Sequence, residues 1–275
     1  MVVTVLVENT SPGALRCAHG LSLHVRTGDR SILFDFGPDG ELLAENAGKL
    51  GADLAAVDAA VLSHGHNDHA GGLEAFLRLN GHAPVYAHKL AFGKHSAQRP
   101  YGRKDIGADP SLPEKYPGRF RLTEGTVSAD GGVTLFSDVA GTALISGSNG
   151  TLYEGEGDGL QRDRFLHEQN MLLEAEGKLI LIAGCAHRGI VNILRRAEEI
   201  KGRAPDAVFS GFHLTNPGLG TDEPEAFVRA VGEALLACPS VYYTGHCTGE
   251  GPFRLLREIL GPRLLSLSCG ARFEI

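Results

Sequence analysis

The stretch VLSHGHNDHAGG, residues 61–72, places three histidines and an aspartate within six positions: His64, His66, Asp68 and His69. Their spacing matches neither one face of a helix nor one face of a strand. They can converge only in a tight loop, and the neighbouring glycines permit one. Imidazole nitrogens and carboxylate oxygens are ligands of zinc, iron and manganese. The stretch therefore predicts a metal site.

Further histidines and a cysteine follow apolar runs that read as buried strands. Cys185 and His187 come after LILIAG, His213 after VFSGF and His246 after VYYTG, while His64 itself follows AAVLS. Strands of one sheet that end at the same edge bring their terminal loops together. We therefore expect these side chains to meet, although they are far apart in the sequence.

The elements that must position these residues alternate along the chain. Short β-type runs occupy 2–8, 21–26, 31–37, 59–63 and 83–88, and helical patterns mark 41–51 and 72–79. In the second half, strands at 178–184, 206–212 and 240–245 alternate with helices at 189–202 and 223–237, and the runs 256–260 and 264–268 finish the chain. This order predicts an α/β (α+β) fold. The stretches 93–118 and 147–162 fit neither pattern, and loops of that length are usually lids or mobile segments.

Composition narrows the class of protein. The chain has 275 residues, 43% of them hydrophobic, and a net charge of −7, which argues against a nucleic-acid binder. Its five cysteines are scattered without a CxxC pair, as in reduced cytosolic proteins. We see no signal peptide and no apolar window long enough to span a membrane. We expect one cytoplasmic domain over 1–275, with a lid or insertion at 93–118 and no nucleic-acid or membrane partner. A homo-oligomer is compatible with the sequence.

The motif His64-x-His66-x-Asp68-His69, followed by two glycines, resembles the signature of the metallo-β-lactamase fold superfamily. Six further blocks resemble one branch of it, named for 7,8-dihydropterin-6-methyl-4-(β-D-ribofuranosyl)aminobenzene 5′-phosphate synthase. They are HGLSLHV (19–25), ILFDFG (32–37), NAGKLG (46–51), GCAHRGIVNIL (184–194), GFHLTNPG (211–218) and GHCTG (245–249). The resemblance implies a four-layer αβ/βα sandwich with a two-metal site at one sheet edge.

The resemblance also implies the metal ligands, residue by residue: His64 and His66 for the first metal, Asp68 and His69 for the second, and His246 at the place of the last histidine ligand. Cys185 stands where many members have a bridging aspartate. A thiolate there favours zinc, with iron and manganese as alternatives. An inert, packed cysteine is the competing interpretation.

The third histidine of the first metal is missing from its usual place. Superfamily members carry it shortly before the position of Cys185, often as Gly-His-Thr, whereas this chain reads DRFLHEQNMLL (163–173). His167 or Glu168 could substitute for it, or His187 could be the third ligand of the first metal. The sequence leaves the three alternatives open.

Other residues are candidates for binding the substrate. His213, with Thr215 and Asn216, could hold a substrate oxyanion or phosphate through hydrogen bonds. The 93–118 stretch is basic, and we expect Arg99 and Arg103 in it to contact a phosphate or carboxylate, although a solvated basic surface would look the same. Asp35 is expected to accept a hydrogen bond from a ligand imidazole and so fix its tautomer.

Two adjacent metals lower the pKa of a shared water to near neutrality. Asp68 is placed to orient that water and shuttle its proton, and His213 to stabilise developing negative charge. The sequence therefore predicts a metal-dependent hydrolase with two divalent ions, zinc first, acting on a small anionic ester or phosphate-containing substrate. A transferase of the branch's synthase type is the alternative. A diiron redox enzyme is a remote one, because His66 stands where such enzymes usually have glutamate.

Overall fold

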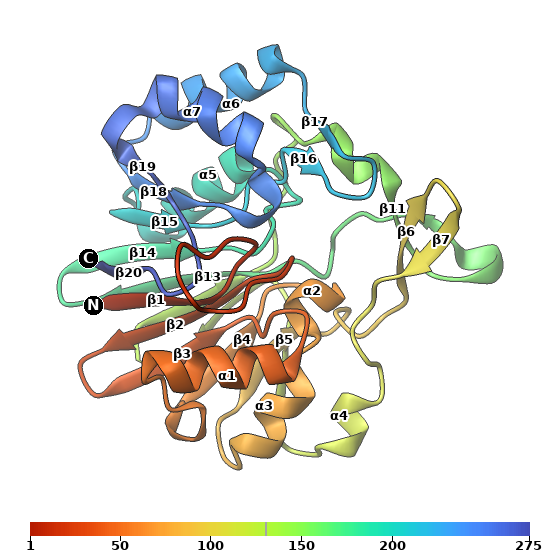
Figure 1. Ribbon diagram of the computed structural model, residues 1–275, viewed down its shortest axis with the longest axis vertical. Coiled ribbons are helices and arrows are strands. Elements are labelled where there is room, and N and C mark those ends of the chain that lie inside the picture. Colours follow the sequence, from red (N-terminus) through yellow and green to blue (C-terminus); the bar gives the residue numbers. More distant parts are fainter. Residues whose placement is uncertain (130) are drawn as a thin grey trace.

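The computed structural model describes residues 1–129 and 131–275. Within them, two seven-stranded β-sheets pack face to face, and helices cover the outer face of each (Figure 1). The strand order is β20-β1-β2-β3-β4-β5-β8 in the first sheet and β19-β18-β15-β14-β13-β10-β9 in the second. This is the four-layer αβ/βα sandwich that the resemblance implies.

The first sheet comes from the N-terminal half, with one added strand from the C-terminus. Its strands are β1 (Val2–Val7), β2 (Ser22–Thr27), β3 (Arg30–Phe34), β4 (Ala59–Leu62), β5 (Val85–His88), β8 (Phe120–Thr123) and β20 (Arg272–Glu274). Helices α1 (Gly40–Leu50) and α3 (Leu73–Leu79) pack on its outer face. Asp39 caps α1 by accepting the Leu42 N–H, and Gly51 ends it in the left-handed conformation (φ 70°), as the pattern at 41–51 predicts.

The second sheet is built from the C-terminal half. Its strands are β9 (Thr126–Ala129), β10 (Val133–Phe136), β13 (Asn170–Ala175), β14 (Lys178–Ile182), β15 (Ala207–Phe209), β18 (Val241–Thr244) and β19 (Leu264–Ser266). Helices α5 (Ile190–Lys201), α6 (Glu225–Leu236) and α7 (Glu250–Leu260) cover its outer face. The strands between 120 and 175 were not expected, because runs such as MLLEA suit a helix equally well and only pairing with a neighbouring strand makes them β.

Alternation along the strands divides the core into three layers. Ile32 and Phe34 on β3 point into the space between the sheets, whereas Leu33 between them packs under the helices. Both faces of the sheet are covered, so the strand is apolar at every inner position. Phe209 and Tyr243, on adjacent strands, stack between the sheets with ring centroids 4.3 Å apart.

The two stretches without expected elements pair with each other. β6 (His95–Arg99) and β7 (Gly102–Asp105) form a hairpin, and β11 (Leu152–Glu154) and β12 (Gln161–Arg162) extend it into a small sheet of order β12-β11-β6-β7. The hairpin projects beside the sandwich at the right of Figure 1. Its strands have only two to five residues, and β7 is exposed at every position, so no apolar alternation marks them in the sequence.

Short elements complete the described chain. They are α2 (Asn67–Ala70), α4 (Leu112–Lys115), β16 (Thr215–Asn216), β17 (Thr221–Asp222) and the 3₁₀ turns Leu54–Ala56, Gly147–Thr151, Gly157–Gly159, His246–Thr248 and Gly261–Arg263. Among the described residues, none of the helices has both the length and the apolar character that a membrane span requires.

Candidate metal centre

The predicted ligands gather at one edge of the sandwich, in loops that follow strands of both sheets. His64, His66, Asp68 and His69 follow β4, Cys185 and His187 follow β14, His213 follows β15 and His246 follows β18. The neighbouring strands β3–β4–β5 and β14–β15–β18 run parallel, so their ends meet at this edge. Gly65 permits the sharp first loop, because a Cβ there would overlap the Ala91 carbonyl oxygen.

One group of donors consists of Asp68, His69, Cys185 and His246, whose ligand atoms all lie within 4.8 Å of one another. His69 Nε2 is 3.2 Å from both Cys185 Sγ and His246 Nε2, and Asp68 Oδ2 is 3.4 Å from His246 Nε2. The group contains Asp68 and His69, to which the resemblance assigns the second metal, together with the last histidine, His246, and the expected bridging cysteine. We call this group the second position.

Outer partners aim the imidazoles of the second position. His69 Nδ1 lies 2.6 Å from Asp35 Oδ2, the contact that was expected of Asp35. His246 Nδ1 lies 3.0 Å from Asn9 Oδ1, and the amide nitrogen of the same asparagine donates to the His246 carbonyl. Both outer atoms are acceptors, so in each neutral ring the proton is on Nδ1 and the Nε2 lone pair faces the group.

The other candidate ligands form two overlapping sets, His64 with Cys185 and His187, and His64 with His66 and Asp68. We call His64, His66, Cys185 and His187 together the first position. Ser63 Oγ donates to Asp35 Oδ2 at 2.7 Å and has no second proton to give. His64 Nδ1, 2.8 Å from the same hydroxyl oxygen, must therefore carry the proton of that ring. The Nε2 of His64 is left as a lone pair.

His66 turns its Nδ1 toward His64 Nε2 at 3.1 Å and its Nε2 toward the Asp163 carboxylate. Burial lowers the pKa of both histidines, so both rings are neutral. The facing nitrogens of His64 and His66 are 3.1 Å apart and share at most one proton. With the proton of His66 on Nε2, toward the carboxylate, they present two lone pairs that a cation between them would accept, so these residues fit a bound metal.

His187 completes the first position. Asn149 donates from its amide nitrogen to the His187 carbonyl at 2.8 Å, and its Oδ1 accepts from His187 Nδ1 at 2.9 Å. His187 Nε2 is buried and finds no hydrogen-bond partner among the described residues. His187, two residues after Cys185, thus lies where the missing third histidine is needed.

The other two alternatives have different contacts. The Glu168 carboxylate accepts the backbone N–H groups of His187 and Arg188 at 2.6 and 3.0 Å, and burial raises its pKa to about 7. It supports the His187 loop rather than facing the donors. His167 accepts the Gly65 N–H and contacts Asp163, behind His66.

Four residues at the site adopt left-handed backbone angles that side chains usually avoid: Asp35 (φ 59°), Ala186 (φ 55°), His213 (φ 49°) and His246 (φ 51°). Each costs on the order of 1–3 kcal/mol and persists only where the surrounding structure holds it. Such strain is concentrated at functional sites, and here it lies at the ends of strands that deliver donor atoms.

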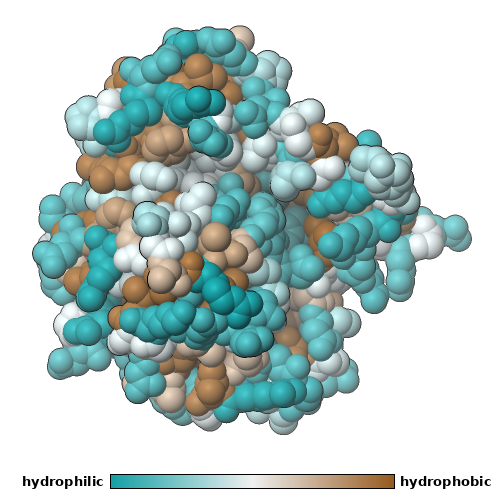
Figure 2. Space-filling model, in the orientation of Figure 1, coloured by the Kyte–Doolittle hydropathy of each residue, from teal (hydrophilic) through white to brown (hydrophobic). Residues whose placement is uncertain are grey.

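A pocket of about 280 Å³ opens over the donors, and Figure 2 shows the hollow between the sandwich and the hairpin lobe. Candidate ligands on its wall are His66, Asp68, Cys185 and His187, and His213, Arg99 and Lys104 also line it. Both ring nitrogens of His213 are buried without a hydrogen-bond partner in the described part of the chain. They are free to meet a ligand in the pocket.

Two residues expected at the substrate lie elsewhere. Arg103 does not line this pocket but packs over the Tyr153 ring, 4.7 Å from its centroid, while Lys104 beside it faces the pocket. Thr215 likewise points away, donating to the Thr221 carbonyl, while Asn216 lines the pocket. The reason is the same in both cases, because neighbours on a strand point to opposite faces.

Sequence reasoning missed several residues of the site. His19 Nε2 lies 3.3 Å from Asp68 Oδ2 at the pocket wall, and Asn9, His95 and Asp163 contact candidate ligands or their partners. His19 opens one of the blocks that resemble the family branch, which was a usable signal. The other three belong to no quoted block; Asn9 follows the buried strand β1, which was a usable signal, whereas His95 and Asp163 follow no buried strand.

The sequence model of the metallo-β-lactamase superfamily matches residues 16–161, more than half of the chain. Together with the sandwich and the donors at its edge, this shows that the chain belongs to that superfamily.

The chain is also similar to individual proteins along most of its length. The chain is 27% identical over 243 residues to 7,8-dihydropterin-6-methyl-4-(β-D-ribofuranosyl)-aminobenzene-5′-phosphate synthase of Methanocaldococcus jannaschii, covering 84% of this chain and 81% of the relative. An uncharacterized protein of the same organism is 34% identical over 227 residues, 78% of this chain and 79% of its own length. The crystal structure of Tm1679, described as a metal-dependent hydrolase of the β-lactamase superfamily, matches with a TM-score of 0.83 and 26% identity over 100% of this chain and 99% of its own.

Proposed function

We propose that the protein is a metal-dependent hydrolase that holds two divalent cations, zinc in the first place, and acts on a small anionic substrate. The observation that carries the proposal is the convergence of buried imidazole, carboxylate and thiol donors at one sheet edge, with the facing nitrogens of His64 and His66 3.1 Å apart in neutral rings. His64, His66, Cys185 and His187 would hold one cation, and Asp68, His69, Cys185 and His246 the other. Bound there, the cations would supply Lewis acidity and a nucleophile at neutral pH.

The protein's own residues contribute the rest of the chemistry. Asp68 lines the pocket, and its imidazole neighbours outweigh burial and hold its pKa well below the usual range, so its carboxylate is ionised. It is placed to accept a hydrogen bond from the attacking water and to orient it. His213, with both nitrogens unpartnered by the described residues, is placed to contact the oxygen on which negative charge develops.

Two cationic side chains support an anionic substrate. Arg99 and Lys104 reach the pocket wall from the β6–β7 hairpin, in a protein of net charge −7. They are the groups that would bind a phosphate or carboxylate away from the reacting bond. Pro217 and Leu152 also line the pocket, and they would contact apolar parts of the substrate.

Metal analysis and a chelation assay test the proposal. Protein purified without chelator should contain more than one equivalent of metal and hydrolyse a chromogenic phosphodiester or ester. Chelation should abolish that turnover, and zinc, iron or manganese added back singly should show which metal restores it. Full turnover by metal-free protein, or no binding of any of the three metals, would contradict the proposal.

A transferase is the second candidate, supported by the 27% identity to the synthase across 84% of this chain. The same cations would then activate a leaving group, and Arg99 and Lys104 would hold the phosphate of the acceptor. Incubation with 4-(β-D-ribofuranosyl)aminobenzene 5′-phosphate and a 7,8-dihydropterin with a leaving group on its 6-methyl carbon distinguishes the two. A coupled product in the mass spectrum favours the transferase, and release of the leaving group without coupling favours the hydrolase.

A further inference from the structure

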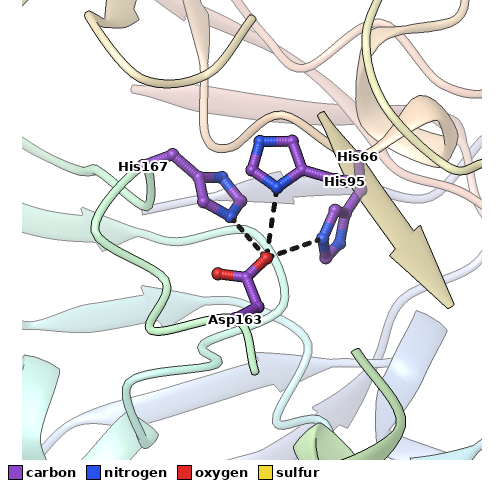
Figure 3. A group of neighbouring side chains, drawn as sticks. All are labelled: His66, His95, Asp163 and His167. Carbon is purple, nitrogen blue, oxygen red and sulfur yellow. Dashed lines mark hydrogen bonds and ion pairs between the residues drawn. The ribbon is translucent and has the colours of Figure 1, made fainter. Parts of the chain in front are cut away.

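Four buried side chains lie behind the first position: His66, His95, Asp163 and His167 (Figure 3). One carboxylate oxygen, Asp163 Oδ2, lies 3.1 Å from His167 Nε2, 3.2 Å from His95 Nδ1 and 3.8 Å from His66 Nε2. The other oxygen accepts the backbone N–H of Phe165 at 2.7 Å. Three imidazoles therefore converge on one atom of a side chain that is fully shielded from solvent.

Three imidazoles and a carboxylate would also suit a zinc ion of their own, and the contact between Gly65 and His167 decides against it. The Gly65 N–H can only donate, and it lies 3.0 Å from His167 Nδ1. His167 Nδ1 is therefore a lone pair, and a ring that accepts a hydrogen bond on one nitrogen can carry a proton only on the other. Its single proton is on Nε2, facing Asp163, and a protonated nitrogen does not bind a metal. His167 and His95 can therefore donate to Asp163 Oδ2, and His66 Nε2 faces the same oxygen from 3.8 Å, with no other hydrogen-bond partner among the described residues.

We infer that Asp163 is a positioning residue for the metal centre: its carboxylate keeps the proton of His66 on Nε2 and so keeps the Nδ1 lone pair of His66 turned toward His64. The inference rests on the proposed metal binding but not on the reaction that follows. Asp163 would act on the first position as Asp35 acts on the second, through the far nitrogen of a ligand imidazole.

The alternative tautomer of His66 shows what the carboxylate prevents. With its proton on Nδ1, His66 would donate a hydrogen bond to His64 Nε2 across the same 3.1 Å. Two ligands would then bind each other instead of a cation. The Nε2 lone pair of His66 would also point at the ionised carboxylate 3.8 Å away, in a site shielded from water, which is electrostatically unfavourable. The position of Asp163 thus selects the metal-binding tautomer.

The substitution Asp163→Asn tests this directly. The amide oxygen must stay on the Phe165 N–H, so the amide NH₂ replaces Oδ2 and presents a donor to the three imidazoles. His66 can respond by changing its tautomer, which removes its lone pair from the first position. We expect one of the two metal equivalents to bind about 10- to 100-fold more weakly in a chelator competition, with the second position unchanged.

Asp138→Asn is the matched control. It also removes one carboxylate, but from a partly exposed ion pair with Arg196 that includes none of the candidate ligands, and both equivalents should bind as in the wild type. If Asp163→Asn binds both metals with wild-type affinity while folded, the inference is wrong. If the wild-type protein binds no metal, the proposed function fails instead, so the two failures are distinguishable.

Nuclear magnetic resonance of the wild-type protein gives a second test that needs no variant. In protein loaded with ¹¹³Cd and labelled with ¹⁵N, Nδ1 of His66 should couple to the metal, while Nε2 of His66 carries a proton. Loss of the Nε2 proton signal in Asp163→Asn would accompany the weakened affinity. A third equivalent of metal, bound through Nε2 of His66 or His167, would overturn the inference, because the cluster would then be a metal site itself.

Discussion

At the scale of single residues, the donor atoms are aimed by partners that lie outside the centre. Asp35 connects both positions, because Oδ2 contacts His69 Nδ1 and also accepts from Ser63, which in turn holds His64. Asn9 and Asn149 do the same for His246 and His187. Each of these partners fixes which ring nitrogen keeps its proton in the neutral ring, so the Nε2 atoms of these four histidines already face the centre.

Removal of the Asp68 side chain should abolish turnover without unfolding the protein. The side chain is partly exposed at the pocket, so Asp68→Ala leaves no core cavity, yet it removes the carboxylate that we propose as a ligand of the second position and as the group that orients water. We expect kcat to fall by on the order of 10²- to 10⁴-fold on a substrate that needs the metals. Asp158→Ala, on an exposed turn, is the control. Wild-type rates for Asp68→Ala would show that its role is misassigned.

Metal affinity should rise with pH because of His69. Burial alone lowers the pKa of His69, but the Asp35 and Asp68 carboxylates outweigh it and raise the pKa to about 9. Below that pH a cation must displace a proton, so affinity should increase between about pH 6.5 and 9, by up to tenfold per pH unit for this proton. In the metal-free protein the same shift stabilises the fold fully below about pH 6.5, and this stabilisation is lost as pH rises through 9. Zinc titrations against a chelator across this range check the sign, and a flat profile would contradict it.

At the scale of elements, strand alternation determines which basic side chains reach the pocket. On β7, Lys104 faces it and Arg103 packs on Tyr153. On β6, Arg99 reaches across to the loop after His213, where its guanidinium lies against Gly218. The hairpin therefore contributes charge to the pocket from one face only.

Arg99→Ala should raise KM for an anionic substrate about tenfold, the loss of roughly one charge-assisted hydrogen bond, and should affect a neutral chromogenic ester less. Arg103→Ala is the matched control, because it removes the same charge from the same hairpin but not from the pocket. Gly218→Ala should reproduce the KM effect without changing the net charge, since a Cβ there displaces the Arg99 guanidinium. Equal effects of Arg99→Ala on both substrates would leave the hairpin without a role in binding.

At the scale of the whole molecule, the centre depends on both halves of the sandwich. The first sheet supplies His64 through His69, and the second supplies Cys185, His187 and His246. Glu8, which follows β1, accepts the His246 backbone N–H at 2.6 Å and so ties the two sheets together at the site. The packing between the sheets therefore controls the distances between ligands.

Phe209→Ala should loosen that packing. Phe209 is fully buried between the sheets, stacks on Tyr243 at 4.3 Å and contacts Phe273. Its truncation should lower the free energy of unfolding by about 3–5 kcal/mol. Urea unfolding followed by circular dichroism measures this. Leu219→Ala, at a side chain that is 49% exposed, should change stability by no more than about 0.5 kcal/mol, and a similar loss for both variants would rule out the assigned packing role.

The sequence by itself determined an alternation of strands and helices and the edge at which the candidate donors gather, and its resemblance to a known superfamily implied the sandwich. The spacing of the motif from His64 to His69 restricts the loop conformation, because four donor side chains within six residues have few ways to converge. The other donors follow buried apolar strands, whose ends a parallel sheet must bring together. These are local patterns, and local patterns can be read from a chain.

Only the tertiary structure decided which residues face one another across the loops. It placed His187 at the first position and turned His167 toward Asp163, although the sequence left both open. It paired the two stretches without expected elements into one small sheet and put Lys104, not Arg103, on the pocket. These outcomes depend on pairing register and on contacts between distant segments. A shift of one residue in register reverses the face of every side chain on a short strand, and nothing in the local sequence records it.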